Sequence, residues 1–116
     1  MVDDSKIVRT IARRIVKELG FETIEAEDGS FAIEECKKKM PDCILLDWNM
    51  PVMNGIEFLE TLRQEEGGDK PHVIFCTIET DESYIQEAMD KGADEYIMKP
   101  FDSDIIKTKF EQTGLL

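Results

Sequence analysis

Apolar residues along this chain occur either at helical spacing or in short continuous runs, and the two patterns alternate. The first helical stretch covers residues 5–19, where Ser5 can cap the start and Gly20 can end the helix. Its apolar face consists of Val8, Ala12, Ile15 and Leu19. Further helices are predicted over residues 31–40, from residue 56 to the glycine pair at 67–68, and over 81–91 and 102–112.

Short strands are predicted between these helices, over residues 1–2, 22–26, 43–46, 72–77 and 95–98. The run from Cys43 to Leu46 is apolar throughout, which is typical of a strand buried on both faces. This alternation predicts an α/β fold with a doubly wound parallel sheet, right-handed crossovers and helices on both faces. A length of 116 residues suits one such domain, residues 1–116, without a second module.

Polar side chains stand where the predicted strands end. Asp3 and Asp4 follow the first strand, and Asp47 follows the third. Thr77 ends the fourth strand and Lys99 follows the fifth. Because α/β sheets bind ligands beyond the carboxyl ends of their strands, we expect these groups to share one crevice.

Each of these side chains also has an ordinary structural interpretation. Asp47 could simply open a loop, as acids often do. Thr77 could be a β-branched strand residue, and Lys99 could pair with an acid for stability. Their joint occurrence at successive strand ends favours a functional site.

Three carboxylates in one crevice repel one another unless a cation neutralises them. Oxygen ligands without histidine or thiol favour a hard ion, and Mg²⁺ is the ion expected here. Such a site accepts phosphate oxygens, to which Lys99 would add a positive contact and Thr77 a hydroxyl donor.

Composition narrows the classes of partner. A formal net charge of −12 argues against nucleic acid and against anionic membrane surfaces. Neither a membrane-spanning segment nor a signal peptide is visible, which predicts a cytoplasmic protein without membrane insertion. The cysteines Cys36, Cys43 and Cys76 lack metal-binding spacing and suit reduced thiols, and His72 alone does not indicate a zinc site.

Four motifs carry a resemblance to a known family: Asp3-Asp4-Ser5, Asp47-Trp48-Asn49-Met50-Pro51 with Asn54-Gly55, Thr77, and Lys99-Pro100-Phe101. They resemble the signature of response-regulator receiver domains of the single-domain chemotaxis-regulator (CheY-like) type, and the resemblance covers nearly the whole chain. The intervals from Asp47 to Thr77 and to Lys99 also match the family. The resemblance implies a flavodoxin-like, five-stranded sheet in the order 2-1-3-4-5, which is carried over from the family.

The resemblance also implies roles for individual residues. Asp47 resembles the phosphoacceptor, which becomes an aspartyl phosphate. Asp4 and Asp47 resemble carboxylate ligands of Mg²⁺, with Asp3 acting mainly through water and the Asn49 backbone carbonyl completing the set. Thr77 and Lys99 would hold the phosphoryl oxygens.

A switch is implied as well, in which Thr77 moves toward the phosphoryl group and Tyr96 turns inward. The expected function is a phosphorylation-dependent response regulator, not an enzyme, that accepts its phosphoryl group from a sensor histidine kinase or a phosphotransfer protein. A downstream protein would bind the face formed by residues 81–91, 95–98 and 102–112, and a monomer is expected.

Two departures from the family pattern stand out. Only Met1 and Val2 precede Asp3, so the first strand is unusually short for a central strand and leaves its neighbours' backbone groups partly unpaired. Ile78 follows Thr77, where the family prefers a small residue, and should restrict the entry of water and small phosphodonors.

Other functions share parts of this pattern. A phosphate sink or a relay intermediate would have the same residues. A magnesium-dependent phosphohydrolase usually needs a second acid two residues after its nucleophile, where this chain has Asn49. A passive acidic interaction module would keep the fold without the ordered site.

Overall fold

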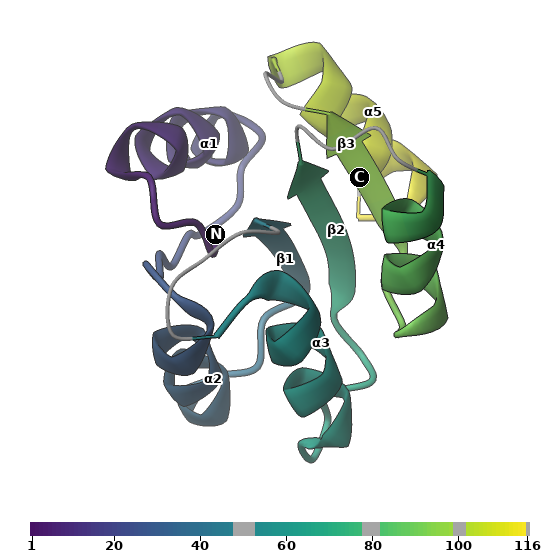
Figure 1. The fold of residues 1–116 in the computed structure, drawn as a ribbon. Helices are drawn as coiled ribbons and strands as arrows, with labels where there is room; N and C mark the ends of the chain where they lie inside the picture. Colours follow the sequence, from purple (N-terminus) through teal and green to yellow (C-terminus); the bar gives the residue numbers. More distant parts are fainter. Residues whose placement is uncertain (48–52, 78–81, 99–101, 116) are drawn as a thin grey trace.

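The computed structural model of the chain describes residues 1–47, 53–77, 82–98 and 102–115. Its helices are α1 (Lys6–Glu18), α2 (Gly29–Lys38), α3 (Gly55–Gln64), α4 (Glu82–Asp90) and α5 (Ser103–Gln112). Its strands are β1 (Cys43–Asp47), β2 (His72–Thr77) and β3 (Glu95–Met98). Figure 1 shows the strands side by side with helices on both faces, which confirms the predicted α/β class. None of the described helices is long and apolar enough to cross a membrane.

Short polar side chains set the starts of four helices by accepting a backbone N–H bond from the first turn. These caps are Ser5, Asp28, Asn54 and Asp102. At α3 the Glu57 side chain also accepts a bond from the Asn54 N–H, which completes a capping box. Because Asp28 is a cap rather than part of a free turn, α2 begins at Gly29, two residues before the predicted start.

The three strands run parallel in the order β1-β2-β3. Asp47 of β1 pairs with Cys76 of β2, and Thr77 pairs with Met98 of β3. The carboxyl ends of the three strands therefore lie at one edge of the sheet, as predicted.

The amino-terminal side of the sheet is shorter than predicted. Val2 forms single parallel bridges to Ala26 on one side and to Leu46 on the other, so it lies between them in the sheet. The predicted strand over residues 22–26 is wrong, since only Ala26 pairs there. Among the described residues the expected five-stranded sheet is thus three strands and two bridges.

The cause of this difference is the short apolar segment ahead of Asp3. The Met1 amino group donates to the Ile24 carbonyl at 2.8 Å, and among the described residues the ladder goes no further in that direction. A cavity of about 430 Å³ opens beside this point, between the segment 21–26 and the start of β1. The side chains of α2 and α5 that line it include Cys36 and Phe110.

Two apolar cores cover the two faces of the sheet. The core beneath α2, α3 and α4 includes Ile44, Leu46, Phe58, Leu59, Leu62, Val73, Phe75 and Ala88. The core beneath α1 and α5 includes Ala12, Val16, Leu45, Ile74, Cys76, Ile97, Ile106 and Phe110. Successive strand residues alternate between the two cores because side chains of a strand point to opposite faces in turn.

Arg63 secures the end of the sheet that lies away from the strand carboxyl ends. Its guanidinium donates to the carbonyls of Gly68 and Pro71 at 2.9 Å each and to the carbonyl of Gly92 at 2.6 Å. It also contacts the Asp94 carboxylate at 3.2 Å. One side chain from α3 therefore connects the loops that precede β2 and β3.

Candidate functional site

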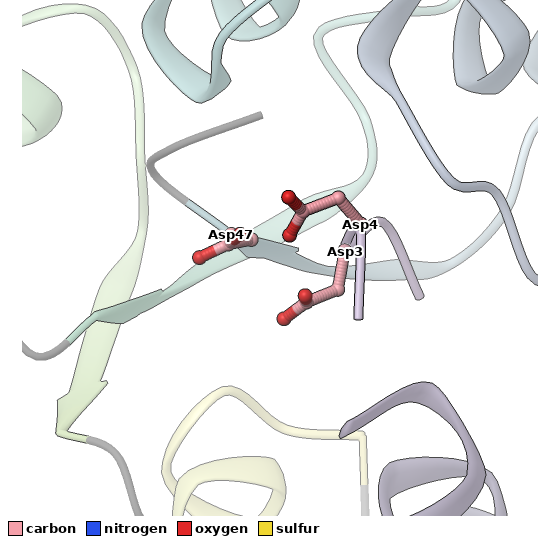
Figure 2. Close-up of side chains that lie close together, drawn as sticks. All are labelled: Asp3, Asp4 and Asp47. Carbon is pink, nitrogen blue, oxygen red and sulfur yellow. The ribbon is translucent and has the colours of Figure 1, made fainter. Parts of the chain in front are cut away.

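Three carboxylates converge at the carboxyl end of β1. One oxygen from each of Asp3, Asp4 and Asp47 lies within 4.8 Å of the others (Figure 2). Asp3 and Asp47 are buried, with 5% and 8% of their surface exposed, whereas Asp4 is exposed. The strand-end pattern therefore predicted correctly that these three acids lie together.

The backbone of the shortened first strand brings the acids to this position. The Asp47 N–H donates to the Val2 carbonyl at 2.8 Å, and the Asp3 N–H donates to the Ala26 carbonyl at 3.1 Å. Asp47 is the last residue of β1, so its side chain stands at the sheet edge. The few ladder bonds around Val2 thus set the distance between the two buried carboxylates.

The turn from Asp3 into α1 is held by side chains as well as by backbone. The Asp3 carboxylate accepts the Ser5 N–H at 2.9 Å, while Ser5 itself caps α1. Arg9, on the first turns of α1, donates to the Asp3 backbone carbonyl at 2.7 Å. Arg9 also contacts the Glu25 carboxylate at 3.3 Å.

The donor set suits a small, hard cation. All three groups are carboxylates, and oxygen ligands of this kind favour Mg²⁺ over ions that select nitrogen or sulfur. Ligands about 2.1 Å from Mg²⁺ lie about 3 to 4 Å apart, and the separation of at most 4.8 Å between these oxygens is compatible with one shared ion. Two unit charges 4 Å apart near a protein surface repel by about 4 kcal/mol, so a bound cation would relieve a substantial cost.

The described residues include only part of the predicted site. Thr77 is the last residue of β2, but its side chain lies outside the described part of the chain, as do Asn49 and Lys99. Tyr96 lies on β3 opposite Phe75, where its half-buried side chain packs against the core beneath α2, α3 and α4. Its role as a switch stays a prediction.

Sequence reasoning missed Arg9 and Glu25, which lie beside the acid cluster. The helical pattern placed Arg9 on the first helix without indicating what its side chain contacts. Its two partners, Asp3 and Glu25, are 6 and 16 residues away in the sequence. Only the folded arrangement of α1 against the segment 24–26 joins them.

Comparison with known proteins gives matches over nearly the whole chain. Residues 1–111 match the family described as the response regulator receiver domain. Chemotaxis protein CheY-3 of Vibrio cholerae is 37% identical over 97% of this chain and 87% of its own length. Chemotaxis protein CheY of Pseudomonas aeruginosa is 35% identical over 97% of this chain and 91% of its own length.

The fold is shared with solved structures of similar sequence. The structure of Vibrio cholerae chemotaxis protein CheY4 superposes with a TM-score of 0.91 at 31% identity. The superposition covers 96% of this chain and 92% of that chain. Sequence and fold therefore point to the same family.

Proposed function

Because the chain belongs to the response regulator receiver domain family, we propose that it is a phosphorylation-dependent receiver of a two-component signalling system. The observation that carries the proposal is the cluster of Asp3, Asp4 and Asp47 at the carboxyl end of β1. In this proposal the protein acts in the cytoplasm as a signalling protein rather than an enzyme. Its phosphodonor is a sensor histidine kinase or a phosphotransfer protein.

The proposed reaction is transfer of a phosphoryl group to Asp47. An Asp47 carboxylate oxygen attacks the phosphorus of a phosphohistidine, the O–P bond forms as the P–N bond breaks, and the released imidazole takes up a proton. Asp4 and Asp47 would hold Mg²⁺, with Asp3 acting mainly through water and the Asn49 backbone carbonyl completing the set. When bound, the ion neutralises charge on the phosphoryl oxygens.

Thr77 and Lys99 would bind the phosphoryl oxygens after transfer. The pairing of Thr77 with Met98 supports this role, because Lys99 follows Met98 directly in the sequence. The charge added at Asp47 would favour one arrangement of the strand ends, in which Tyr96 turns inward. The face made by α4, β3 and α5 would then bind a downstream protein.

The process that we propose the protein controls is chemotaxis, because several of its relatives are named chemotaxis proteins. A second function, that of a phosphate sink or relay intermediate, would use the same acid cluster without the change at Tyr96. The two functions therefore share the phosphoryl chemistry and differ in output.

Intact mass spectrometry after incubation with Mg²⁺ and acetyl phosphate, or with a phosphorylated phosphotransfer protein, tests the chemistry. We expect a phosphoryl adduct that lasts for minutes and is absent in Asp47→Asn. Asp69→Asn is the matched control, since it removes the same charge from an exposed loop position. Turnover of the donor without an adduct would indicate a phosphohydrolase. Absence of both turnover and adduct would indicate a passive interaction module.

Amide chemical shifts recorded with a phosphate mimic bound at the acid cluster test the output. A switch predicts shifts at Tyr96 and along α4 and α5 as well as around Asp47. Moving a minor conformation to a dominant one needs about 3 to 5 kcal/mol, so partner affinity should rise at least about tenfold. Shifts confined to the surroundings of Asp47 would support the phosphate sink instead.

A further inference from the structure

Arg9 links α1 to the backbone that carries two of the three clustered acids. Its side chain is largely buried, with 14% exposed. One guanidinium nitrogen donates to the Asp3 carbonyl at 2.7 Å, and another contacts Glu25 at 3.3 Å. The carbonyl that accepts this bond belongs to the peptide group between Asp3 and Asp4, so its orientation affects where both carboxylates point.

Arg13 offers a natural comparison one turn further along the same helix. It contacts the other oxygen of the Glu25 carboxylate at 3.0 Å, and its side chain is 39% exposed. Within the described part of the chain, the Arg13 guanidinium donates to the Glu25 carboxylate rather than to the Asp3 carbonyl. The two arginines therefore carry the same charge and share one acid, but only Arg9 reaches the acid cluster.

We propose that Arg9 is a positioning residue for the cation site, because its bond to the Asp3 carbonyl holds the Asp3–Asp4 peptide in the orientation that gathers the three carboxylates. This proposal rests on the proposed function, in which Asp3 and Asp4 help to hold Mg²⁺. Glu25 takes part by holding the guanidinium in place and by offsetting its charge. Arg9 itself does not touch the ion or the phosphoryl group.

Removal of the Arg9 side chain has two expected effects on Mg²⁺ affinity, and they have opposite signs. A guanidinium repels a divalent cation, so the loss of its charge would strengthen cation binding. Loss of the bond to the Asp3 carbonyl would instead weaken binding, since groups that orient metal ligands are typically worth 10- to 100-fold in affinity. The sign of the change in Mg²⁺ affinity thus distinguishes the two effects.

The test is titration with Mg²⁺ alone, followed by Trp48 fluorescence and by calorimetry, in the full chain. We expect about tenfold weaker binding in Arg9→Ala. Arg9→Lys keeps one donor and should recover part of the loss. Arg13→Ala should bind Mg²⁺ as tightly as the unmodified chain or slightly more tightly, because it loses charge without losing a bond to Asp3.

A second measurement separates positioning from a general loss of stability. The rate of phosphoryl transfer from acetyl phosphate, measured against Mg²⁺ concentration well below the melting temperature, should need about tenfold more Mg²⁺ in Arg9→Ala. The maximal rate at saturating Mg²⁺ should be largely retained. A lower maximal rate with an unchanged Mg²⁺ requirement would overturn the proposal, because it would show damage without a change in the cation site.

Further outcomes distinguish this proposal from the proposed function. If Asp4→Asn weakens Mg²⁺ binding but Arg9→Ala binds as tightly as Arg13→Ala, the positioning role of Arg9 is wrong and the cation site stands. If Asp4→Asn and Asp47→Asn leave the titration unchanged, the acid cluster does not hold Mg²⁺ and both proposals fail.

Discussion

Two parts of the sheet use the same parallel hydrogen bonding. One part is formed by β1, β2 and β3, and the other by residues 1–3 and Ala26. They differ in extent and in burial. The first pairs continuously over four to five positions per strand pair, and both its own Phe75 and the Leu59 that covers it from α3 are almost fully buried. The second consists of two single bridges at Val2 and has a cavity beside it.

The cation site lies across the boundary between these two parts. Asp47 belongs to the extensively paired part, whereas Asp3 belongs to the short part and Asp4 follows it directly in the sequence. The geometry of the acid cluster therefore depends on a few bonds, including those of Val2 with β1 and of Arg9 with Asp3. Any ion that binds all three acids would stabilise the short part, because it binds only the folded arrangement.

The largest effect we predict is the contrast between truncating a buried leucine that packs on the extensively paired part and truncating an exposed isoleucine beside the short part. Leu59 on α3 is fully buried, and Leu59→Ala should lower the free energy of unfolding by about 2 to 5 kcal/mol. Ile24 beside the first strand is 47% exposed, and Ile24→Ala should cost less than about 1 kcal/mol. Urea denaturation measures both. Equal losses would show that the short part is packed as firmly as the rest.

An intermediate effect is predicted for a chain lengthened ahead of Met1. Three apolar residues such as Val-Ile-Val can extend the first strand into the cavity between the segment 21–26 and β1. Burial of each added side chain stabilises the fold by roughly 1.5 to 3 kcal/mol, and most of this is offset by the entropy lost when the added residues become ordered. We therefore expect a net gain of about 2 kcal/mol in the free energy of unfolding. The melting temperature measures the gain, and a Gly-Ser-Gly extension is the matched control.

Amide exchange locates the effect of that extension. Strand alternation directs the Leu45 N–H toward the cavity, because the Leu45 carbonyl accepts from Val2 on that side. The N–H groups of Leu45 and Ile24 should become protected in the apolar extension, while those of Ala26 and Asp47, which already donate to Met1 and Val2, should change little. Equal melting temperatures for both extensions would mean that the cavity closes without an added strand.

The smallest effect, taken per pH unit, is the dependence of stability on pH. Burial lowers the pKa of the Met1 amino group from its ordinary value of 8.0 and raises the pKa of the Cys43 thiol from 9.0 to about 12. The unfolded chain binds the amino proton more readily, so stability is lost as pH falls below 8.0. The folded chain holds the thiol proton, so stability is lost as pH rises above 9.0 toward 12.

These two groups therefore predict a stability maximum between pH 8.0 and 9.0, with a slope of at most about 1.4 kcal/mol per pH unit from each group. Urea denaturation across this range measures the profile. Cys43→Ala should reduce the loss of stability above pH 9.0. The apolar extension moves the amino group away from Ile24 and should reduce the loss of stability below pH 8.0. An unchanged alkaline slope in Cys43→Ala would assign the effect to another group.

Much of the fold could be predicted because its determinants are local. Ser5 caps α1 as the pattern indicated, α5 begins one residue after its predicted start, and the strands at 72–77 and 95–98 have the predicted bounds. The exception is the strand expected over residues 22–26. Its alternating residues suit a strand, but a strand also needs a partner, and only Ala26 has one at Val2.

The candidate site divides in the same way. Asp3, Asp4 and Asp47 could be predicted to meet because parallel strands end at one edge of a sheet, whatever the details of packing. The contacts of Arg9 with Asp3 and Glu25 could not, since a long side chain on a helix can reach several neighbours and the sequence does not select among them.

Amino-acid patterns alone were thus sufficient for the helices, for the apolar strands and for the three acids that converge at the sheet edge, because short-range hydrogen bonding and side-chain alternation decide these features. How little of the segment 22–26 pairs with the first strand, the cavity beside it and the link from α1 to the acid cluster depended on contacts between distant segments. Such contacts form only where folding brings two matching surfaces together, so the shape of each partner decides them as much as its sequence.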